Sequence, residues 1–349
     1  MLVLMQRDAT PAQVDGVCEA IAALGFTPLP MPGTTRVAIG LAGDDGHVDT
    51  SHFEGMAGVA QVLYDSKPYK QVSREWQPDK SLVSIGAGVV FGGPEVPVIA
   101  GPCSVEGEAA IVAVAKAVKG AGAVALRGGA YKPRTSPYAF QGLGEEGLRQ
   151  LALARSETGL PVVTEAMDLE QADLVAKWAD CIQIGTRNMS NFALLKHVGR
   201  LGKPVMLKRG MSATITEWLL AAEYIMAEGN RQIILCERGI RSFDSSTRNV
   251  LDLAAIVAVQ RASHLPVIVD PSHGTGVRAM VAPMARAGVA AGADGVIVEV
   301  HPQPDTAWSD GAQSQTVPQF EEMMRTLVPI ADAVGRSITG AGTAFVAGG

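Results

Sequence analysis

The feature that most constrains the fold of this 349-residue chain is a regular alternation of apolar and amphipathic segments from residue 97 onward. Short apolar runs bounded by turn residues are typical of strands in a parallel sheet that is covered on both faces. Between them lie Ala-rich stretches with helical periodicity, as at 109–119, 214–227 and 250–262. The predicted strands lie at 97–100, 124–127, 161–165, 181–185, 204–208, 232–236, 266–270 and 295–300.

Eight strands that alternate with helices in this way predict a (β/α)8 barrel, a TIM barrel, over residues 96–338. A doubly wound open sheet is the alternative, but no GxGxxG motif follows the first strand. The helix predicted at 318–333 would close the ring. We expect the Gly- and Ala-rich tail at 339–349 to be mobile.

The first 75 residues predict a small α+β domain of the ferredoxin-like type, because their elements follow the order βαββαβ. Thr10 and Pro11 supply the cap and the first turn of its first helix. His47 and His52 stand apart from other site-type residues, so we expect them at the surface. The strands are predicted at 2–6, 26–30, 36–41 and 62–64 with 69–72, and the helices at 10–24 and 51–63.

Residues 76–95 are predicted to join the two domains as a linker, at 76–80, and a β-hairpin, at 81–93. The hairpin would turn at the glycine-containing stretch 86–88. Because it immediately precedes the first barrel strand, it could plug the bottom of the barrel.

Composition excludes several classes of protein. The net charge of −6 comes without a basic stripe, so a nucleic-acid partner is not expected. No apolar run approaches the ~20 residues that span a bilayer, and the N-terminus lacks the features of a signal peptide. The four cysteines (Cys18, Cys103, Cys181 and Cys236) lack CxxC spacing, which argues against a disulfide framework or a structural zinc site and favours the reducing cytoplasm.

Every predicted barrel strand ends in, or runs into, an ionisable or metal-ligating residue at the end where the active sites of such barrels are built. An ordinary surface rim would contain more Ser, Asn and Gln, so the pattern indicates a functional site. In strand order the residues are Cys103, Arg127, Glu165, Arg187, Lys208, Arg238, His273 and Glu299.

Two subsets of residues indicate different chemistry. Cys103, His273, Glu299 and Asp310 combine sulfur, nitrogen and oxygen ligands, a mixture that suits Mn, Fe, Co or Zn. A cationic subset favours one or two substrates with several negative charges, although each member alone could form a surface salt bridge. This subset contains Arg127, Lys132, Arg134, Arg187, Lys208, Arg209 and Arg238. A metal beside phosphate-binding cations suggests carbon–carbon bond formation between phosphorylated small molecules.

Five motifs resemble, in order, those of the type I 3-deoxy-D-arabino-heptulosonate 7-phosphate (DAHP) synthases. They are GPCSVE at 101–106, KPRTS at 132–136, DPSH at 270–273, EVHP at 299–302 and SDGAQS at 309–314. The resemblance covers about residues 80–338. The preceding unit is similar to the ferredoxin-like (ACT-like) regulatory domain found on one branch of that family.

The resemblance implies a metal-dependent, aldol-like condensation of phosphoenolpyruvate with D-erythrose 4-phosphate, which gives DAHP and phosphate. This is the first step of the shikimate pathway and of aromatic amino acid biosynthesis. The metal would lie on Cys103, His273, Glu299 and Asp310, with Mn²⁺ expected first and Fe²⁺, Co²⁺ or Zn²⁺ as alternatives.

The resemblance also implies roles for the other site residues. Arg127 and Lys132 would hold the carboxylate end of phosphoenolpyruvate, and Asp310 would border the substrates as well as the metal. Lys132, His273 and Glu165 are the candidates for proton transfer and for activation of water. The phosphate of phosphoenolpyruvate would contact Arg187, Lys208 and Arg238, and erythrose 4-phosphate would contact Arg134, Thr135 and Ser136.

Two alternatives stay open at this point. One is a 3-deoxy-octulosonate 8-phosphate synthase, which uses arabinose 5-phosphate and carries an Asn-Arg-Ser type of loop in place of KPRTS. The other is a non-catalytic sugar-phosphate-binding barrel. The resemblance further implies feedback inhibition by tyrosine or phenylalanine bound to the N-terminal domain, and a homotetramer.

Overall fold

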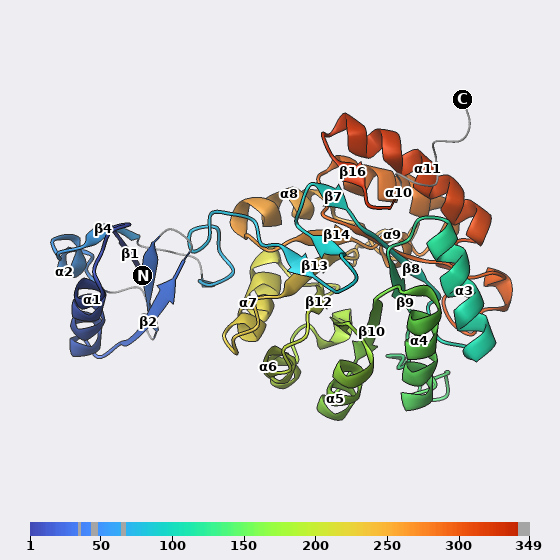
Figure 1. Cartoon of the computed structure of the whole chain (residues 1–349), viewed down its shortest axis with the longest axis horizontal. Helices are drawn as coiled ribbons and strands as arrows, with labels where there is room; N and C mark the ends of the chain where they lie inside the picture. The colour runs from blue at the N-terminus through green and yellow to red at the C-terminus, as the bar shows by residue number, and fades with distance from the viewer. Residues whose placement is uncertain (34–35, 43–47, 64–67, 341–349) are drawn as a thin grey trace. The chain divides into compact units, whose positions relative to one another are not determined.

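The computed structural model of the chain describes residues 1–33, 36–42, 48–63 and 68–340 (Figure 1). The chain divides into two compact units between Asp79 and Lys80. His47, Tyr64 and residues 341–349 of the expected mobile tail lie outside the described residues. In the part of the chain that is described, no helix has the length and apolar character needed to cross a membrane.

The N-terminal unit contains a four-stranded antiparallel sheet in the order β2-β3-β1-β4, as in ferredoxin-like folds. Val17 and Ile21 of the first helix pack with Val3 and Ile39 of the sheet. The prediction of a ferredoxin-like domain is therefore confirmed. The elements are β1 (Leu2–Met5), α1 (Pro11–Ala23), β2 (Thr27–Pro32), β3 (Val37–Ala42), α2 (Ser51–Glu54) and β4 (Val59–Leu63).

The second half of this unit departs from the prediction. The helix α2 ends at Glu54 rather than at residue 63, because Gly55 follows it and Gly58 adopts a φ of 84° that does not continue a helix. Residues 59–63 instead form β4, in which Val62 pairs with Val3 of β1. The last strand is therefore earlier than predicted, and the stretch 69–72, all of it described, contains no strand.

The second unit is a closed barrel of eight parallel strands, which confirms the predicted fold class. Pairing of Val296 with Val98 and of Glu299 with Gly101 joins the last strand to the first. The strands are β8 (Val98–Gly101), β9 (Ala125–Arg127), β10 (Val162–Ala166), β11 (Cys181–Ile184), β12 (Val205–Lys208), β13 (Ile233–Glu237), β14 (Val267–Val269) and β15 (Val296–Glu299).

Helices surround the barrel, and each presents an apolar face to the strands (Figure 1). A short helix, α9 (Pro271–Thr275), also follows β14 directly and carries His273. The longer helices are α3 (Glu108–Gly120), α4 (Glu145–Thr158), α5 (Leu169–Trp178), α6 (Phe192–Arg200), α7 (Ile215–Met226), α8 (Leu253–Ala262), α10 (Arg278–Ala290) and α11 (Val317–Ala333).

A β-hairpin of β5 (Val83–Ser84) and β6 (Val90–Phe91) plugs the barrel at the end where its strands begin. Its apolar side chains share one buried cluster with the first or second residue of every barrel strand. The fit is tight, since a Cβ added to Gly295 would lie 2.7 Å from the Phe91 ring. This end of the barrel is therefore closed by apolar packing. Two further short strands, β7 (Glu95–Val96) and β16 (Ser337–Ile338), pair with each other. In the sequence, β7 precedes β8 and β16 follows α11.

Replacement of Phe91 by alanine should lower the free energy of unfolding by about 3–5 kcal/mol, because it removes a fully buried ring from the plug. Chemical denaturation followed by circular dichroism measures this change. Leu82→Ala is the matched control, since Leu82 lies on the same hairpin with 66% of its surface exposed, and its effect should stay within about 0.5 kcal/mol. Equal effects of the two substitutions would contradict the role of the hairpin as a plug.

Candidate active site

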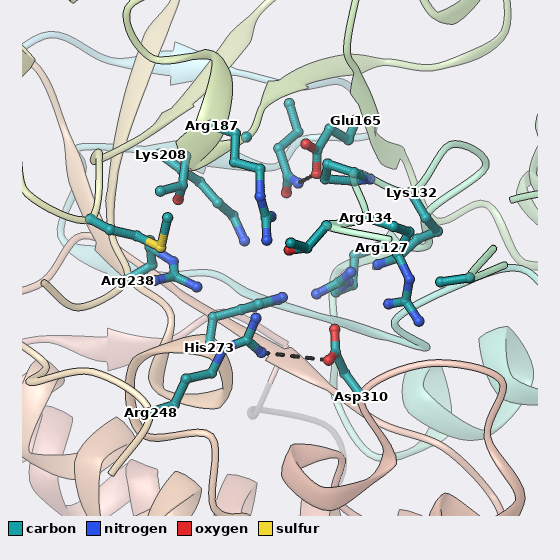
Figure 2. Close-up of a pocket in the computed structure, with 17 residues that line it drawn as sticks. Arg127, Lys132, Arg134, Glu165, Arg187, Lys208, Arg238, Arg248, His273 and Asp310 are labelled. Carbon is teal, nitrogen blue, oxygen red and sulfur yellow. Dashed lines mark hydrogen bonds and ion pairs between the residues drawn. The ribbon is translucent and has the colours of Figure 1, made fainter. Parts of the chain in front are cut away.

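The C-terminal ends of the barrel strands open into a cavity of about 260 Å³ (Figure 2). Cys103 and Glu299 are buried and reach the lining residues through hydrogen bonds. Ser136 does not line the cavity; its hydroxyl accepts a hydrogen bond from the backbone N–H of Tyr138. The predicted site residues that do line it are Arg127, Lys132, Arg134, Thr135, Glu165, Arg187, Lys208, Arg238, His273 and Asp310.

Three of the four predicted metal ligands meet at one side of this cavity, and the fourth, His273, lies beside one of them. Cys103, Glu299 and Asp310 each offer one ligand atom, and these atoms lie within 4.8 Å of one another. The Cys103 thiol donates to Oδ2 of Asp310 at 3.1 Å, and Nε2 of His273 lies 3.3 Å from Oε1 of Glu299. A thiol, an imidazole and two carboxylates are a donor set that fits a divalent transition metal.

The ring of His273 is oriented by Asp270. Asp270 caps α9 by accepting the backbone N–H of His273, and its Oδ2 lies 2.7 Å from Nδ1 of the ring. Lys208 donates to the same oxygen at 2.6 Å. Burial opposes ionisation, but the charges of His273 and Lys208 hold the pKa of Asp270 well below its usual value. An ionised Asp270 keeps the proton on Nδ1, so the lone pair of Nε2 faces Glu299 and is available to a metal.

Burial lowers the pKa of His273, while the charge of Asp270 opposes that shift. The lowered pKa favours the neutral ring, which is the form that ligates metals. Burial and the charge of Glu299 raise the pKa of the Cys103 thiol to about 12, against the smaller effect of Lys132. A bound cation would reverse that shift, because metals bind the thiolate.

Two buried cations, Arg127 and Lys132, complete the floor of the cavity. Nη1 of Arg127 donates to Oε1 of Glu299 at 2.9 Å, and Nη2 donates to the backbone oxygen of Cys103 at 3.2 Å. Nζ of Lys132 donates to the same backbone oxygen at 3.0 Å and lies 2.8 Å from the sulfur of Cys103. Both side chains are therefore fixed against the candidate metal ligands and still line the cavity.

A second group of cations lies across the cavity from Asp310 and contains Arg187, Lys208 and Arg238 (Figure 2). Arg238 is 4% exposed, and within the described residues Nη1 of its guanidinium has no hydrogen-bond partner. Burial lowers the pKa of this guanidinium from its ordinary value. A buried cation with a free donor that lines a cavity is suited to bind an anion such as phosphate.

Glu165 lies at the wall of the cavity, where Gln183 donates to its Oε2 at 2.9 Å. Its other oxygen, Oε1, is buried and has no partner in the part of the chain that is described. Gly185 leaves the room for this carboxylate, because a Cβ at that position would lie 1.9 Å from Oε1. The free oxygen is available to a substrate group or to water.

The loop that carries Arg134 and Thr135 contacts the loop that carries Asp310. The rings of Phe140 and Trp308 form a T-shaped pair with centroids 5.0 Å apart. The two loops therefore lie side by side above the cavity, one with predicted sugar-phosphate ligands and the other with a predicted metal ligand.

Arg209 does not join the cationic group, contrary to the prediction. Successive residues of a strand point to opposite faces, so Lys208 points into the barrel and Arg209 points away from it. The guanidinium of Arg209 instead donates to Glu237 at 2.9 Å and to Asp252 at 3.0 Å. It forms a structural ion pair.

Several residues of the site were not found by inspection of strand ends. Arg248 lines the cavity and lies 3.5 Å from Asp310, but it belongs to the long loop between β13 and α8. Asp270 could have been found, because an Asp followed by Pro is a helix-start signal and His273 lies three residues further along. The other two are Thr186, whose hydroxyl is buried, and Gln313, which donates to Glu299 at 2.6 Å.

Comparison with known protein families gives two matches. The model of the DAHP synthetase I family matches residues 79–334, and that of the DAHP synthase ferredoxin-like domain matches residues 1–64.

Individual relatives agree with these matches. A phospho-2-dehydro-3-deoxyheptonate aldolase from Thermotoga maritima is 46% identical over 96% of this chain and 99% of its own. The crystal structure of such an enzyme (DAHP synthase) from the same organism superposes with a TM-score of 0.78 at 45% identity, over 97% of this chain and 98% of that one. A 2-dehydro-3-deoxyphosphooctonate aldolase from Syntrophotalea carbinolica is 36% identical over 72% of this chain and 97% of its own.

Proposed function

This chain belongs to the DAHP synthetase I family, and from that premise we propose that it catalyses a metal-dependent, aldol-like condensation of phosphoenolpyruvate with D-erythrose 4-phosphate. The products are DAHP and phosphate, and the reaction is the first step of the shikimate pathway. The observation that carries the proposal is the juxtaposition, in one cavity, of a Cys–His–Glu–Asp cluster with an excess of cations. The cations are Arg127, Lys132, Arg134, Arg187, Lys208, Arg238 and Arg248.

The positions of these cations suit two anionic substrates. Arg127 and Lys132, beside the candidate metal ligands, would hold the carboxylate of phosphoenolpyruvate. Arg187, Lys208 and Arg238 would hold its phosphate, while Arg134 and Thr135 would hold the phosphate of the sugar. Binding at both ends fixes the methylene carbon of phosphoenolpyruvate towards the aldehyde, which turns a bimolecular encounter into a nearly unimolecular step.

Cys103, His273, Glu299 and Asp310 would hold a divalent ion, with Mn²⁺ proposed first and Fe²⁺, Co²⁺ or Zn²⁺ as alternatives. When bound, this ion supplies a Lewis acid for the aldehyde oxygen of erythrose 4-phosphate.

The remaining chemistry is proton transfer by side chains of the cavity. Attack by the methylene carbon forms the new carbon–carbon bond and leaves a negative oxygen that must take up a proton. Burial would lower the pKa of Lys132, but the neighbouring Cys103 and Glu299 raise it, so its ammonium is a proton donor in place. Water then adds to the second carbon of phosphoenolpyruvate and phosphate leaves. The free Oε1 of Glu165 is the group we propose to orient that water.

This chain is also similar to 2-dehydro-3-deoxyphosphooctonate aldolases. Arabinose 5-phosphate, the five-carbon sugar, is therefore the alternative substrate. The KPRTS motif and the match to the DAHP synthetase I family support the four-carbon sugar, and Arg134 and Thr135 of this loop line the cavity. We also propose that the N-terminal unit binds tyrosine or phenylalanine as a feedback inhibitor and that the protein is a homotetramer.

The four cysteines are free, which favours a cytoplasmic location.

The reaction itself can be tested with protein that has been stripped of metal. We expect consumption of phosphoenolpyruvate, followed by the ultraviolet absorbance of its double bond, to be absent at first and restored by Mn²⁺ with erythrose 4-phosphate. Preference for arabinose 5-phosphate would show that the role of the KPRTS loop is misassigned. Turnover that is unaffected by stripping would contradict the metal site, and no turnover with either sugar would favour a non-catalytic barrel.

Arg238→Ala should raise the KM for phosphoenolpyruvate about 30-fold, because a charge-assisted hydrogen bond to phosphate contributes about 2 kcal/mol. Steady-state kinetics at saturating erythrose 4-phosphate measure the change. Arg241→Ala is the matched control, since Arg241 is an exposed arginine three residues further along that does not line the cavity. Equal KM values for the two variants would remove Arg238 from the phosphate site.

Deletion of residues 1–75 should leave turnover intact and abolish inhibition by tyrosine or phenylalanine. The barrel has its own core and its own plug, so it should fold without the N-terminal unit. Initial rates with and without each amino acid provide the measurement. Loss of turnover on truncation, or a full-length enzyme insensitive to aromatic amino acids, would show that the unit has another role.

A further inference from the structure

The loop that carries Asp310 holds this residue in a strained backbone conformation. Asp310 has φ of 48° and ψ of 34°, in the left-handed region that residues other than glycine seldom adopt. The next residue, Gly311, approaches the chain so closely that a Cβ would lie 2.0 Å from the backbone oxygen of Pro304. Such strain persists only where surrounding contacts impose it.

Glu106, between β8 and α3, contacts this loop at two points. Its Oε2 lies 3.1 Å from Nε2 of His301, and its Oε1 accepts the backbone N–H of Trp308 at 2.8 Å. The side chains of Glu106 and His301 are both 12% exposed. A single, largely buried carboxylate therefore bridges the start of the loop and the residue two positions before Asp310.

The ring of His301 transmits this contact to the backbone of the loop. Its Nδ1 lies 3.1 Å from the backbone N of Gln303, which can only donate, so Nδ1 accepts. Nε2 then carries the proton and donates to Glu106. Both nitrogens of a neutral ring are thus satisfied, and the first turn of the loop is tied to the β8 side of the barrel.

A second connection runs beside the candidate metal ligands. The hydroxyls of Ser104 and Ser309 lie 2.7 Å apart, and both residues are buried. Ser104 follows Cys103 and Ser309 precedes Asp310, so this hydrogen bond lies next to the one between Cys103 and Asp310. The two segments are joined at adjacent positions.

We propose that Glu106 and His301, with Ser104 and Ser309, form a clamp that holds Asp310 in place to ligate the metal. None of the four lines the cavity, so they are positioning residues and act through Asp310. The inference rests on the metal site proposed above. It assigns a purpose to Glu106 of the GPCSVE motif and to His301 of the EVHP motif, which the substrate and metal contacts leave unexplained.

Titration of the stripped full-length protein with Co²⁺ tests the clamp without any need for turnover. A thiolate-to-cobalt absorption band should report binding at Cys103. We expect Glu106→Ala to weaken Co²⁺ binding about 10–100-fold, as is common when the partner of a metal ligand is removed. Glu106→Gln keeps an oxygen that can accept the backbone N–H of Trp308. This variant should therefore stay close to the native fold and lose less Co²⁺ affinity. Glu108→Ala, an exposed carboxylate nearby, is the matched control and should not change the affinity.

A double-mutant cycle separates positioning from a general structural effect. If the clamp acts through Asp310, Glu106→Ala should change Co²⁺ affinity by less than about 2-fold in a chain that already carries Asp310→Ala. A loss that persists in that background, or wild-type affinity in both Glu106 variants, would overturn the clamp and leave the metal site standing. A wild-type protein without the cobalt band would overturn the metal site itself, and the clamp with it.

Discussion

Glu299 is fully buried at the end of β15, and its charge is compensated by Arg127 at 2.9 Å, by Gln313 at 2.6 Å and by the nearby ring of His273. Burial alone would raise the pKa of this carboxyl, but His273 and Arg127 lower it, so the group is ionised. Removal of one partner from such a buried pair typically costs about 3–5 kcal/mol. The same carboxylate therefore fixes Arg127, which we propose binds substrate, and orders the candidate metal ligands around it.

The two ends of the barrel differ in character, because one is packed with apolar side chains and the other is lined with charged ones. At the end where the strands begin, every strand contributes at least one buried residue to the cluster that includes Phe91 of the hairpin, and this described cluster contains no Asp, Glu, Lys, Arg or His. At the other end, charged side chains replace apolar ones at nearly every strand, and several depend on each other for compensation. Apolar packing at one end supplies stability that the charged end does not.

Sequence reasoning succeeded where one periodicity decided the outcome. The eight strands, the hairpin and the convergence of residues such as Cys103 and Glu299 all follow from apolar runs and from the rule that parallel strands present their ends on one side. It failed where three-dimensional neighbours decided. Arg209 was misplaced because the alternation of side chains along β12 was not applied, and Arg248 was missed because a long loop has no periodicity. The helical pattern over 51–63 led to a prediction that was too long, because the positive φ of Gly58 cannot be read from that pattern.

The unfavourable features of the charged end share one location and one explanation. Arg238 has an unpaired buried donor, Glu165 has an unpaired buried oxygen among the described residues, and Asp310 has a strained backbone. Each costs stability in the free protein, because a buried polar atom without a partner forfeits its hydration. An anion beside Arg238, and water or a substrate group beside Glu165, would each supply the missing partner. A site prepared in this way would bind its ligands with little rearrangement.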